Sequence, residues 1–326
     1  MFDEKYFREN PKSVKVFVGL PAEEFWEIVE EAKELLEEYD QRRLDRPNRK
    51  RGVGGGRKCE LSLVVRLGMV LTYLRLDISQ EAVAMLYGVT QSDVSRQLRQ
   101  MLPLLAEVLP TPDVWEKLET ETPLTKEEVI ELTELSDGQV IVDATEQRVN
   151  RPQDSRTRKV YYSGKKKQFT LVTQMVTDGE HHIVAISVCF PGAMVDKSVS
   201  DEVGTTRRLP DGCHGMADKG YQGIDKQVGT QYITNPETSE PEGIPRFVFT
   251  TPFKKPRGGE LTEQQLDFNQ RLNSARIRVE HCIGWAKNWS ILSGRFRAHH
   301  SLYTLIMQVV CGLVNLQTSR WQAISA

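Results

Sequence analysis

The spacing of apolar positions changes along the chain, from a helical period in the first part to a strand-like pattern after residue 138. Residues 23–39 carry apolar side chains every three or four positions with acidic residues between them, which predicts an amphipathic surface helix. Residues 61–76 are apolar almost throughout and predict a buried helix. Between the two, residues 41–58 have no period and are rich in Arg and Gly, which is typical of a flexible arm.

A second helical signal lies in SQEAVAMLYGVTQSDVSRQLRQML. The order Ala84, Gly88, Val94, Leu98 has the spacing of a helix-turn-helix, in which a small residue lets the helices approach, glycine takes the turn, and two apolar residues anchor the second helix. A trihelical packing module that contacts no DNA would show the same pattern. In the helix-turn-helix interpretation, the second helix offers these polar and basic side chains to a DNA groove: Gln91, Ser92, Ser95, Arg96 and Arg99.

The second part of the chain is a series of short apolar runs, which predict strands. GQVIVDAT (residues 138–145) is a buried run that carries Asp143 at its end, and CHGMAD (213–218) ends at Asp218. This order of elements predicts an α/β layer with acids at strand ends. The other expected strands are 168–178 and 181–190, which an Asp-Gly-Glu turn joins into a hairpin, and 246–251; helices are expected at 196–208 and 261–290.

Charge is segregated along the chain, although its net value is only −2. Residues 21–40 hold nine acids and one Lys, and residues 113–137 hold nine acids and two Lys, so the rest of the chain is strongly basic. Residues 41–58 and 148–168 each carry eight Lys or Arg against one Asp. Clusters of this kind are the electrostatic footprint of phosphate binding, although either one alone would also be compatible with a solvated surface.

Three acids indicate a metal-dependent site. Strand ends in an α/β sheet face a cleft, so Asp143 and Asp218 would converge if their strands were neighbours, and Glu280 lies at the margin of the buried face of the long helix. Any one of these acids alone would more often be a cap, a turn former or a surface pair. Three converging carboxylates require cations, and oxygen ligands suit a pair of Mg²⁺ or Mn²⁺ ions that drive in-line phosphoryl transfer. In this interpretation Gly220 lets the chain turn away from the metals.

Cysteine content and hydropathy bear on the compartment. The five cysteines are odd in number, scattered and never spaced C-x-x-C, which argues against a disulfide framework and fits a reducing cytoplasm. No apolar run reaches the ~18 residues of a membrane helix, and MFDEKYFREN lacks the apolar core of a signal peptide. We therefore expect no membrane association.

Several motifs in this order resemble the DDE transposases of the bacterial insertion-sequence and PIF/Harbinger group: VIVDATE, YYSGKKKQFTLVTQMV, PGAMVDKS, MADKGYQG and N-x2-R-x3-E-x6-K. The resemblance covers residues 60–318 and implies a ribonuclease H-like catalytic domain, a mixed sheet flanked by helices, behind an N-terminal all-α helix-turn-helix domain. It implies that Asp143, Asp218 and Glu280 are the metal-binding catalytic acids. Asp196 falls on a frequent Asp of the group, with no role assigned.

The resemblance also extends to the basic residues. Arg276 and Lys287 match the positions that flank the glutamate, and we expect them to hold phosphates of the DNA end, although Arg276 could instead pair with Glu280 at i,i+4. Residues 165–167 (Lys165, Lys166 and Lys167) would grip flanking or target DNA, or form a basic loop tip with no fixed contact. This chain has Ala144 where many relatives have Gly, and Asn273 where related enzymes often have Tyr; the insert 235–245 looks like an added surface loop.

These observations predict four segments and one function. The segments are an acidic helix with a basic arm (1–58), a helix-turn-helix domain (59–110), an acidic connector (111–137) and the catalytic domain (138–326). The expected function is a transposase that acts on double-stranded DNA as a homodimer or higher assembly, in the bacterial nucleoid, or in the nucleus if the host is eukaryotic. The alternatives are a domesticated metal-dependent nuclease that no longer transposes, and a catalytically silent DNA-binding regulator.

Overall fold

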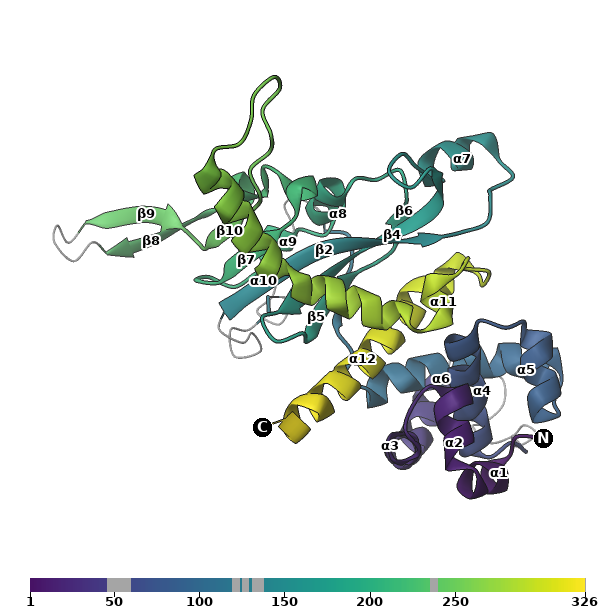
Figure 1. Cartoon of the computed structure of the whole chain (residues 1–326). Coiled ribbons are helices and arrows are strands. Elements are labelled where there is room, and N and C mark those ends of the chain that lie inside the picture. The colour runs from purple at the N-terminus through teal and green to yellow at the C-terminus, as the bar shows by residue number, and fades with distance from the viewer. Residues whose placement is uncertain (46–59, 119–123, 125–128, 131–137, 235–239, 326) are drawn as a thin grey trace. The chain divides into compact units, whose positions relative to one another are not determined.

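The computed structural model describes residues 1–45, 60–118, 124, 129–130, 138–234 and 240–325. Most of the predicted basic arm and acidic connector lies outside these described residues. The chain forms two compact units (Figure 1). The first contains Met1–Thr111, Ala286–Gly294 and Ala298–Leu316, and the second contains Pro112–Trp285, Arg295–Arg297 and Gln317–Ala326. Residues 286–294 and 298–316, expected in the catalytic domain, thus group with the N-terminal helices.

The first unit is helical. The amphipathic pattern of residues 23–39 becomes α3 (Ala22–Leu44), which buries Phe25, Val29 and Ala32. The apolar segment becomes α4 (Leu63–Leu76), where the Ser62 hydroxyl caps the helix by accepting from the Val65 amide. The remaining helices are α1 (Glu4–Glu9), α2 (Pro11–Ser13), the π-helix η1 (Val14–Val18), α5 (Gln80–Tyr87), α6 (Gln91–Val108), α11 (Ser290–Ser293), the 3-10 helix η7 (His300–Leu302) and most of α12 (Tyr303–Ser325).

Helix α12 was not predicted from the sequence. By length and composition alone, the stretch His300–Ala323 could cross a membrane, contrary to the expectation that no segment would qualify. More than half of its most apolar window is buried inside the protein, and a core helix of a soluble protein meets the same criterion.

The second unit is built on a mixed sheet (Figure 1). Its strands lie in the order β1-β5-β4-β2-β7-β10, with β2 antiparallel to β4 and parallel to β7. An antiparallel hairpin next to parallel strands, with helices on both faces, is the ribonuclease H-like arrangement expected. The strands are β1 (Asp113–Trp115), β2 (Gln139–Arg148), β3 (Tyr162–Ser163), β4 (Gln168–Asp178), β5 (Ile183–Ser187), β6 (Phe190–Pro191), β7 (His214–Ala217) and β10 (Val248–Thr250).

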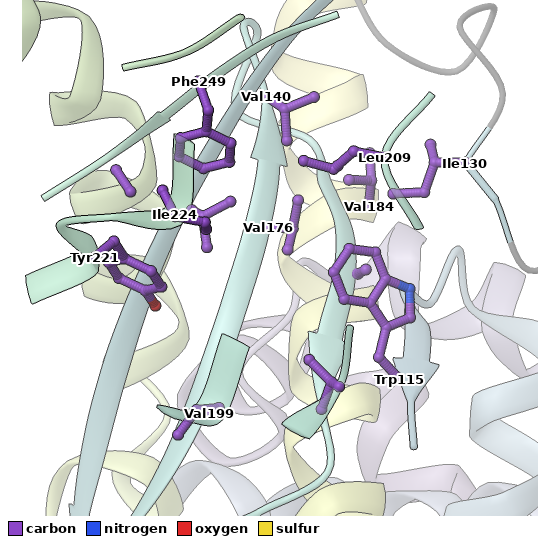
Figure 2. Packing of buried hydrophobic residues seen from close by; sticks show 14 of the residues in the cluster. Trp115, Ile130, Val140, Val176, Val184, Val199, Leu209, Tyr221, Ile224 and Phe249 are labelled. Atoms are coloured by element: carbon purple, nitrogen blue, oxygen red, sulfur yellow. The ribbon is translucent and has the colours of Figure 1, made fainter. Parts of the chain in front are cut away.

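Alternation along β2 assigns the two faces of the sheet. Val140 and Val142 join a buried cluster that includes Val199 of α8 (Asp196–Glu202), so α8 covers this face (Figure 2). Asp143 points to the opposite face, where Arg276 of α10 (Glu263–Lys287) pairs with it. The smaller helices of this unit are α7 (Ser155–Tyr161), α9 (Thr205–Arg208), and the 3-10 helices η5 (Lys219–Tyr221) and η6 (Ile224–Gln227).

Part of the expected surface loop 235–245 is a strand. Residues Pro241–Pro245 form β9, which pairs antiparallel with β8 (Thr230–Thr234) as a separate two-stranded ribbon. Most of its side chains are exposed, as expected for an insert at the surface. Residues 235–239 lie outside the described part of the chain.

Candidate active site

Strand register brings Asp143 and Asp218 together. β2 and β7 are parallel neighbours in which Val142 lies opposite Ala217. The residue after Val142 is Asp143, and the residue after Ala217 is Asp218. The expectation that these strands are neighbours is confirmed. The expectation that Asp143 ends its strand is wrong, because β2 continues to Arg148 by pairing with β4; only the pairing with β7 stops at Val142. β7 ends at Ala217, and Asp218 stops the strand by accepting a hydrogen bond from the Gly220 amide at 2.5 Å. Asp218, with Gly220 two residues later, is therefore a rigidly held acid just after the end of a strand.

Gly220 is required for space rather than for an unusual backbone angle. A Cβ at this position would lie 2.7 Å from Asp218 Oδ1 and 2.8 Å from Asp196 Oδ2. Both oxygens thus lie close to one point, and only a residue without a side chain fits between them. Gly220 is not among the described glycines that have a positive φ. The sequence interpretation that it turns the chain away from the metals is replaced by this steric one.

Asp196 is the acid whose role the sequence left unassigned. It begins α8, which packs on the sheet through Val199, and it meets Asp218 at Gly220. We refer to Asp143, Asp196 and Asp218 as the acid cluster. The signal for Asp196 was present in the motif PGAMVDKS, but nothing in the local sequence showed that α8 would bring this residue to Asp218, just after the end of β7.

Two cations neutralise the acid cluster from different sides. Arg276 Nη2 lies 3.4 Å from Asp143 Oδ2, with only 7% of the arginine side chain exposed. Lys165 Nζ lies 3.6 Å from Asp196 Oδ2, and this lysine side chain is 64% exposed. A buried carboxylate without such partners would be strongly destabilising. Arg276 thus has Asp143 as its partner, and its burial does not present it to a phosphate.

Burial perturbs the protonation of the acid cluster. It raises the pKa of Asp143 to about 6, against the opposing effect of Arg276, while Asp218 and Asp196 add to the rise. Burial also raises the pKa of Asp196, and here Lys165 opposes it. Perturbed carboxyls that lie near one another are typical of functional sites, because a fold gains nothing in stability from them.

Buried polar atoms without a partner lie beside the acids. Tyr221 is fully buried, and its hydroxyl has no hydrogen-bond partner among the described residues; the same is true of Arg276 Nε. The pKa of Tyr221 is raised well above its ordinary value by burial and then by the three members of the acid cluster. Figure 2 shows its ring beside Ile224 with the hydroxyl oxygen pointing away from Phe249. An orphaned donor at a group of carboxylates fits a site that is completed by a ligand.

Glu280 lies on α10, one turn beyond Arg276, and its side chain is exposed. The charges that act most on Asp143 are Arg276, Asp218 and Asp196, and Glu280 is not among them. Within the described ranges, no three His, Cys, Asp or Glu side chains are grouped closely enough to hold a metal ion. The structure thus brings two of the three predicted acids together with Asp196, and leaves Glu280 outside the group.

Contacts just beyond Glu280 hold α10 against the sheet. The imidazole rings of His181, in the β4–β5 turn, and His281 are stacked with centroids 5.5 Å apart, and His181 Nε2 lies 3.3 Å from His281 Nδ1. The Cys282 thiol donates to the His181 carbonyl at 3.3 Å. Arg276 and this histidine pair attach the helix on either side of Glu280, so the position of its backbone relative to the sheet is fixed.

The helix-turn-helix has the geometry predicted from its spacing. Gly88 ends α5 with φ 66°, and Ala84, Val94 and Leu98 are buried between the helices. Thr90 caps α6 in a reciprocal capping box with Asp93.

The polar residues predicted to read DNA lie along the exposed side of α6 and bond within the protein. Arg96 pairs with Asp93 at 2.8 Å, Arg99 donates to the Ser95 hydroxyl at 3.2 Å, and Gln91 donates to Gln80 at 2.6 Å. Gln91, Ser92, Arg96 and Arg99 are exposed and Ser95 is partly exposed.

The three consecutive lysines have different surroundings. Lys165 turns to Asp196, whereas Lys166 and Lys167 are exposed on a tight turn closed by their backbone amides on Ser163. Lys167 adopts a left-handed φ of 55° in this turn. Lys287, at the end of α10, belongs to the first unit.

A sheet with acids on two adjacent parallel strands, accompanied by a helix-turn-helix, indicates the class of DNA-binding phosphodiester-cleaving enzymes. The family described as "DDE superfamily endonuclease" matches residues 142–315, and the family "Helix-turn-helix of DDE superfamily endonuclease" matches residues 59–111. The chain belongs to the DDE superfamily endonucleases. This family implies an endonuclease that uses divalent metal and a helix-turn-helix that binds DNA.

A curated relative supports the same assignment. The chain is 32% identical over 181 residues to the "Probable transposase for insertion sequence element IS702" of Microchaete diplosiphon. The match covers 55% of this chain and 56% of the relative, so the chain spans about half the length of the curated protein it matches. No solved structure matches the chain significantly.

Proposed function

We propose that this protein is a DNA transposase that cuts and joins DNA at the ends of its own element. The observation that carries the proposal is the adjacency of Asp143, within β2, and Asp218, just after the end of the parallel strand β7, because phosphoryl transfer requires rigidly held carboxylates. The likeness to a probable insertion-sequence transposase supports the substrate class.

The donor set of the site fits a hard divalent cation. The acid cluster offers only oxygen ligands, the Tyr221 hydroxyl beside it lacks a partner among the described residues, and the cations Arg276 and Lys165 already compensate part of its charge. We propose Mg²⁺ or Mn²⁺, in two sites, with Asp143 and Asp218 shared and Glu280 completing the second. When bound, such ions would activate a water or a 3′-hydroxyl and stabilise the leaving oxygen.

The residues of the chain have separate tasks in this proposal. Asp143 and Asp218 orient the reacting centre because their strands cannot move independently, and Arg276 holds Asp143 ionised. Glu280 lies on the exposed side of a helix that is attached before and after it, and completing the second site requires its side chain to approach the centre. Its role remains a proposal, since it lies outside the acid cluster.

DNA contacts would come from both units. The exposed face of α6 would enter a groove through Gln91, Ser92, Ser95, Arg96 and Arg99, after Arg96 and Arg99 exchange their intramolecular partners for DNA. Lys166, Lys167 and Lys287 would bind phosphates. We propose a homodimer or higher assembly, since two DNA ends must be handled together, and a location where chromosomal DNA is found: the bacterial nucleoid, or the nucleus of a eukaryotic host.

A cleavage assay tests the proposal. The wild-type protein should nick supercoiled DNA and transfer the ends of its element in Mg²⁺ or Mn²⁺ but not in EDTA. Asp143→Ala, Asp218→Ala and Glu280→Ala should each lower the rate by about a thousandfold or more. Asp201→Ala, which removes an exposed acid of α8 paired with Lys197, serves as the matched control and should retain the rate.

The outcomes separate the alternatives. Equal activity of the wild type and the three active-site variants would remove the enzyme and leave a DNA-binding regulator. Nicking without strand transfer on the element's own ends would indicate the domesticated nuclease. Full activity of Glu280→Ala alone would remove only the second site.

A further inference from the structure

An internal cation already lies among the carboxylates. Burial lowers the pKa of Lys165, but the nearby charges of Asp196, Asp218, Asp143 and Glu146 outweigh it, so the net pKa is raised. Its ammonium lies 3.6 Å from Asp196 Oδ2. The positive charge of Lys165 is therefore placed where four acids would otherwise repel one another.

Asp196 is as firmly positioned as Asp143 and Asp218. It begins α8, whose Val199 is fully buried in the core of the sheet, and its Oδ2 approaches the same Gly220 as Asp218 Oδ1 does. Only 16% of its side chain is exposed. Glu280, by contrast, is exposed and is not among the charges that act most on Asp143 or Asp196.

Tyr221 gives an observation that is independent of the acids. Its side chain is fully buried and its hydroxyl has no partner among the described residues, although the surrounding charges are those of the acid cluster. A buried hydroxyl that is left unpaired costs free energy. The cost is recovered when a ligand, or an ordered water of a ligand, accepts a hydrogen bond from it. The hydroxyl thus indicates that the group of acids binds something.

We propose that Asp196 is the third carboxylate ligand of the divalent ion held by Asp143 and Asp218, and that Lys165 is a built-in counter-cation that leaves Asp196 when the ion binds. The inference rests on the proposed metal-dependent function. It assigns the acid cluster to the ion bound before DNA arrives, and Glu280 to the second ion.

The geometry explains how the exchange occurs. Lys165 is on the short turn between Ser163 and Gln168, and 64% of its side chain is exposed, so its ammonium can swing into solvent without disturbing the sheet. The backbones of Asp196, Asp218 and Asp143 remain in place because α8, β7 and β2 hold them, and their carboxylates, which are not close enough together to hold an ion as they stand, close on it by side-chain rotation. The Tyr221 hydroxyl then donates a hydrogen bond to a carboxylate or a water of the completed site.

The test measures Mn²⁺ binding by isothermal titration calorimetry with the full-length protein and no DNA. Asp196→Asn should weaken binding by more than about tenfold, as Asp143→Asn and Asp218→Asn should, because each removes a charged oxygen ligand. Asp201→Asn on the same helix should bind as the wild type does. Glu280→Gln should also bind normally while losing DNA cleavage.

Lysine variants give an independent readout. Lys165→Met should tighten Mn²⁺ binding about fivefold, because a competing positive charge is removed. Lys226→Met, at an exposed position of η6, should leave Mn²⁺ affinity unchanged. Thermal unfolding in EDTA identifies any variant that fails to fold.

Each result decides one point. Wild-type affinity in Asp196→Asn, with weakened binding in Asp143→Asn, overturns the role of Asp196 but leaves the proposed function intact. Unchanged binding in Asp143→Asn and Asp218→Asn overturns the metal site itself. Weaker binding in a folded Lys165→Met overturns the displacement, and weaker binding in Glu280→Gln overturns the assignment of the first ion.

Discussion

The helix-turn-helix and the acid cluster use their polar side chains in opposite ways. In the helix-turn-helix, Thr90 and Asp93 satisfy one another and the first amides of α6, and Ser79 does the same for α5. In the acid cluster, carboxylates face one another and the Tyr221 hydroxyl has no partner within the described residues. The first arrangement stabilises the fold, whereas the second is tolerated because the surrounding sheet is rigid.

This difference determines what a substitution should change in each region. Residues of the helix-turn-helix core contribute directly to the free energy of unfolding, through burial and capping. Residues of the acid cluster contribute little to stability or oppose it, and their value lies in ligand binding. The four predictions below test this separation, beginning with the largest expected effect.

Leu98→Ala should be the most destabilising change. Leu98 is 2% exposed between α5 and α6, so its truncation leaves a cavity and should lower the free energy of unfolding of the helical unit by about 2–5 kcal/mol. Urea unfolding followed by circular dichroism measures this. Met85→Ala is the matched control, since Met85 lies on α5 with 75% of its surface exposed and should change stability by less than about 0.5 kcal/mol. Equal losses in the two variants would contradict the assigned packing.

The pH dependence of stability should identify Asp143 as a group that opposes folding when ionised. Burial raises its pKa to about 6 in the folded protein, above the ~3.9 of an unfolded chain. Between these values the folded state holds a proton that the unfolded state has lost, so stability falls as pH rises from about 4 to about 7. The loss should approach about 3 kcal/mol and then stop, because both states are ionised above the folded pKa.

The measurement compares the wild type with Asp143→Asn in EDTA over this pH range. As pH rises, the free energy of unfolding of the wild type should fall relative to that of Asp143→Asn. Taking the difference between the two proteins cancels the contributions of other groups. A saturating divalent ion should remove the slope, since it stabilises the ionised carboxylate. A difference that is constant with pH would show that Asp143 is not perturbed by burial.

Local signals explain why the helix-turn-helix and the central strands could be predicted from the sequence. Gly88 at a turn, Thr90 with Asp93 at a helix start, and the apolar alternation of β2 and β4 act through near neighbours or through one sheet face. The adjacency of Asp143 and Asp218 was inferred because acids at strand ends lie together in an α/β sheet, although β2 in fact continues past Asp143 to Arg148. Strand β4 spans 168–178, the same residues that the pattern predicted.

Other features depend on contacts that no local pattern contains. The pairing of Lys165 with Asp196 joins a turn to a helix start, and the pairing of Arg276 with Asp143 joins residues 133 positions apart. The sequence assigned Arg276 to phosphate or to Glu280, because i,i+4 neighbours are the only partners that a helix reveals by itself. The grouping of α12 with the N-terminal helices has the same origin, since only the packed structure shows which surface covers an apolar helix.

Gly220→Ala should damage the site without a large loss of stability. The added methyl would lie 2.7 Å from Asp218 Oδ1 and 2.8 Å from Asp196 Oδ2, so at least one carboxylate must move. We expect Mn²⁺ affinity and cleavage to fall by about tenfold to a hundredfold. Gly284→Ala is the control, because its Cβ meets nothing within 4 Å in α10 and should stabilise the helix by about 0.5–1 kcal/mol. Normal activity in Gly220→Ala would show that the two carboxylates do not need this point of approach.

The smallest predicted effect concerns the cap of α6. The Thr90 hydroxyl accepts from the Asp93 amide at 3.2 Å and donates to Asp93 Oδ2 at 2.7 Å, and the same carboxylate accepts from the Thr90 amide at 3.1 Å. Thr90→Ala should cost about 1 kcal/mol and increase amide exchange in the first turn of α6, whereas Thr90→Ser should retain most of the stability. Because the cap lies in the helical unit, Mn²⁺ binding should stay at the wild-type value in both variants. A change in Mn²⁺ affinity without a change in stability would contradict the separation of roles between the two regions.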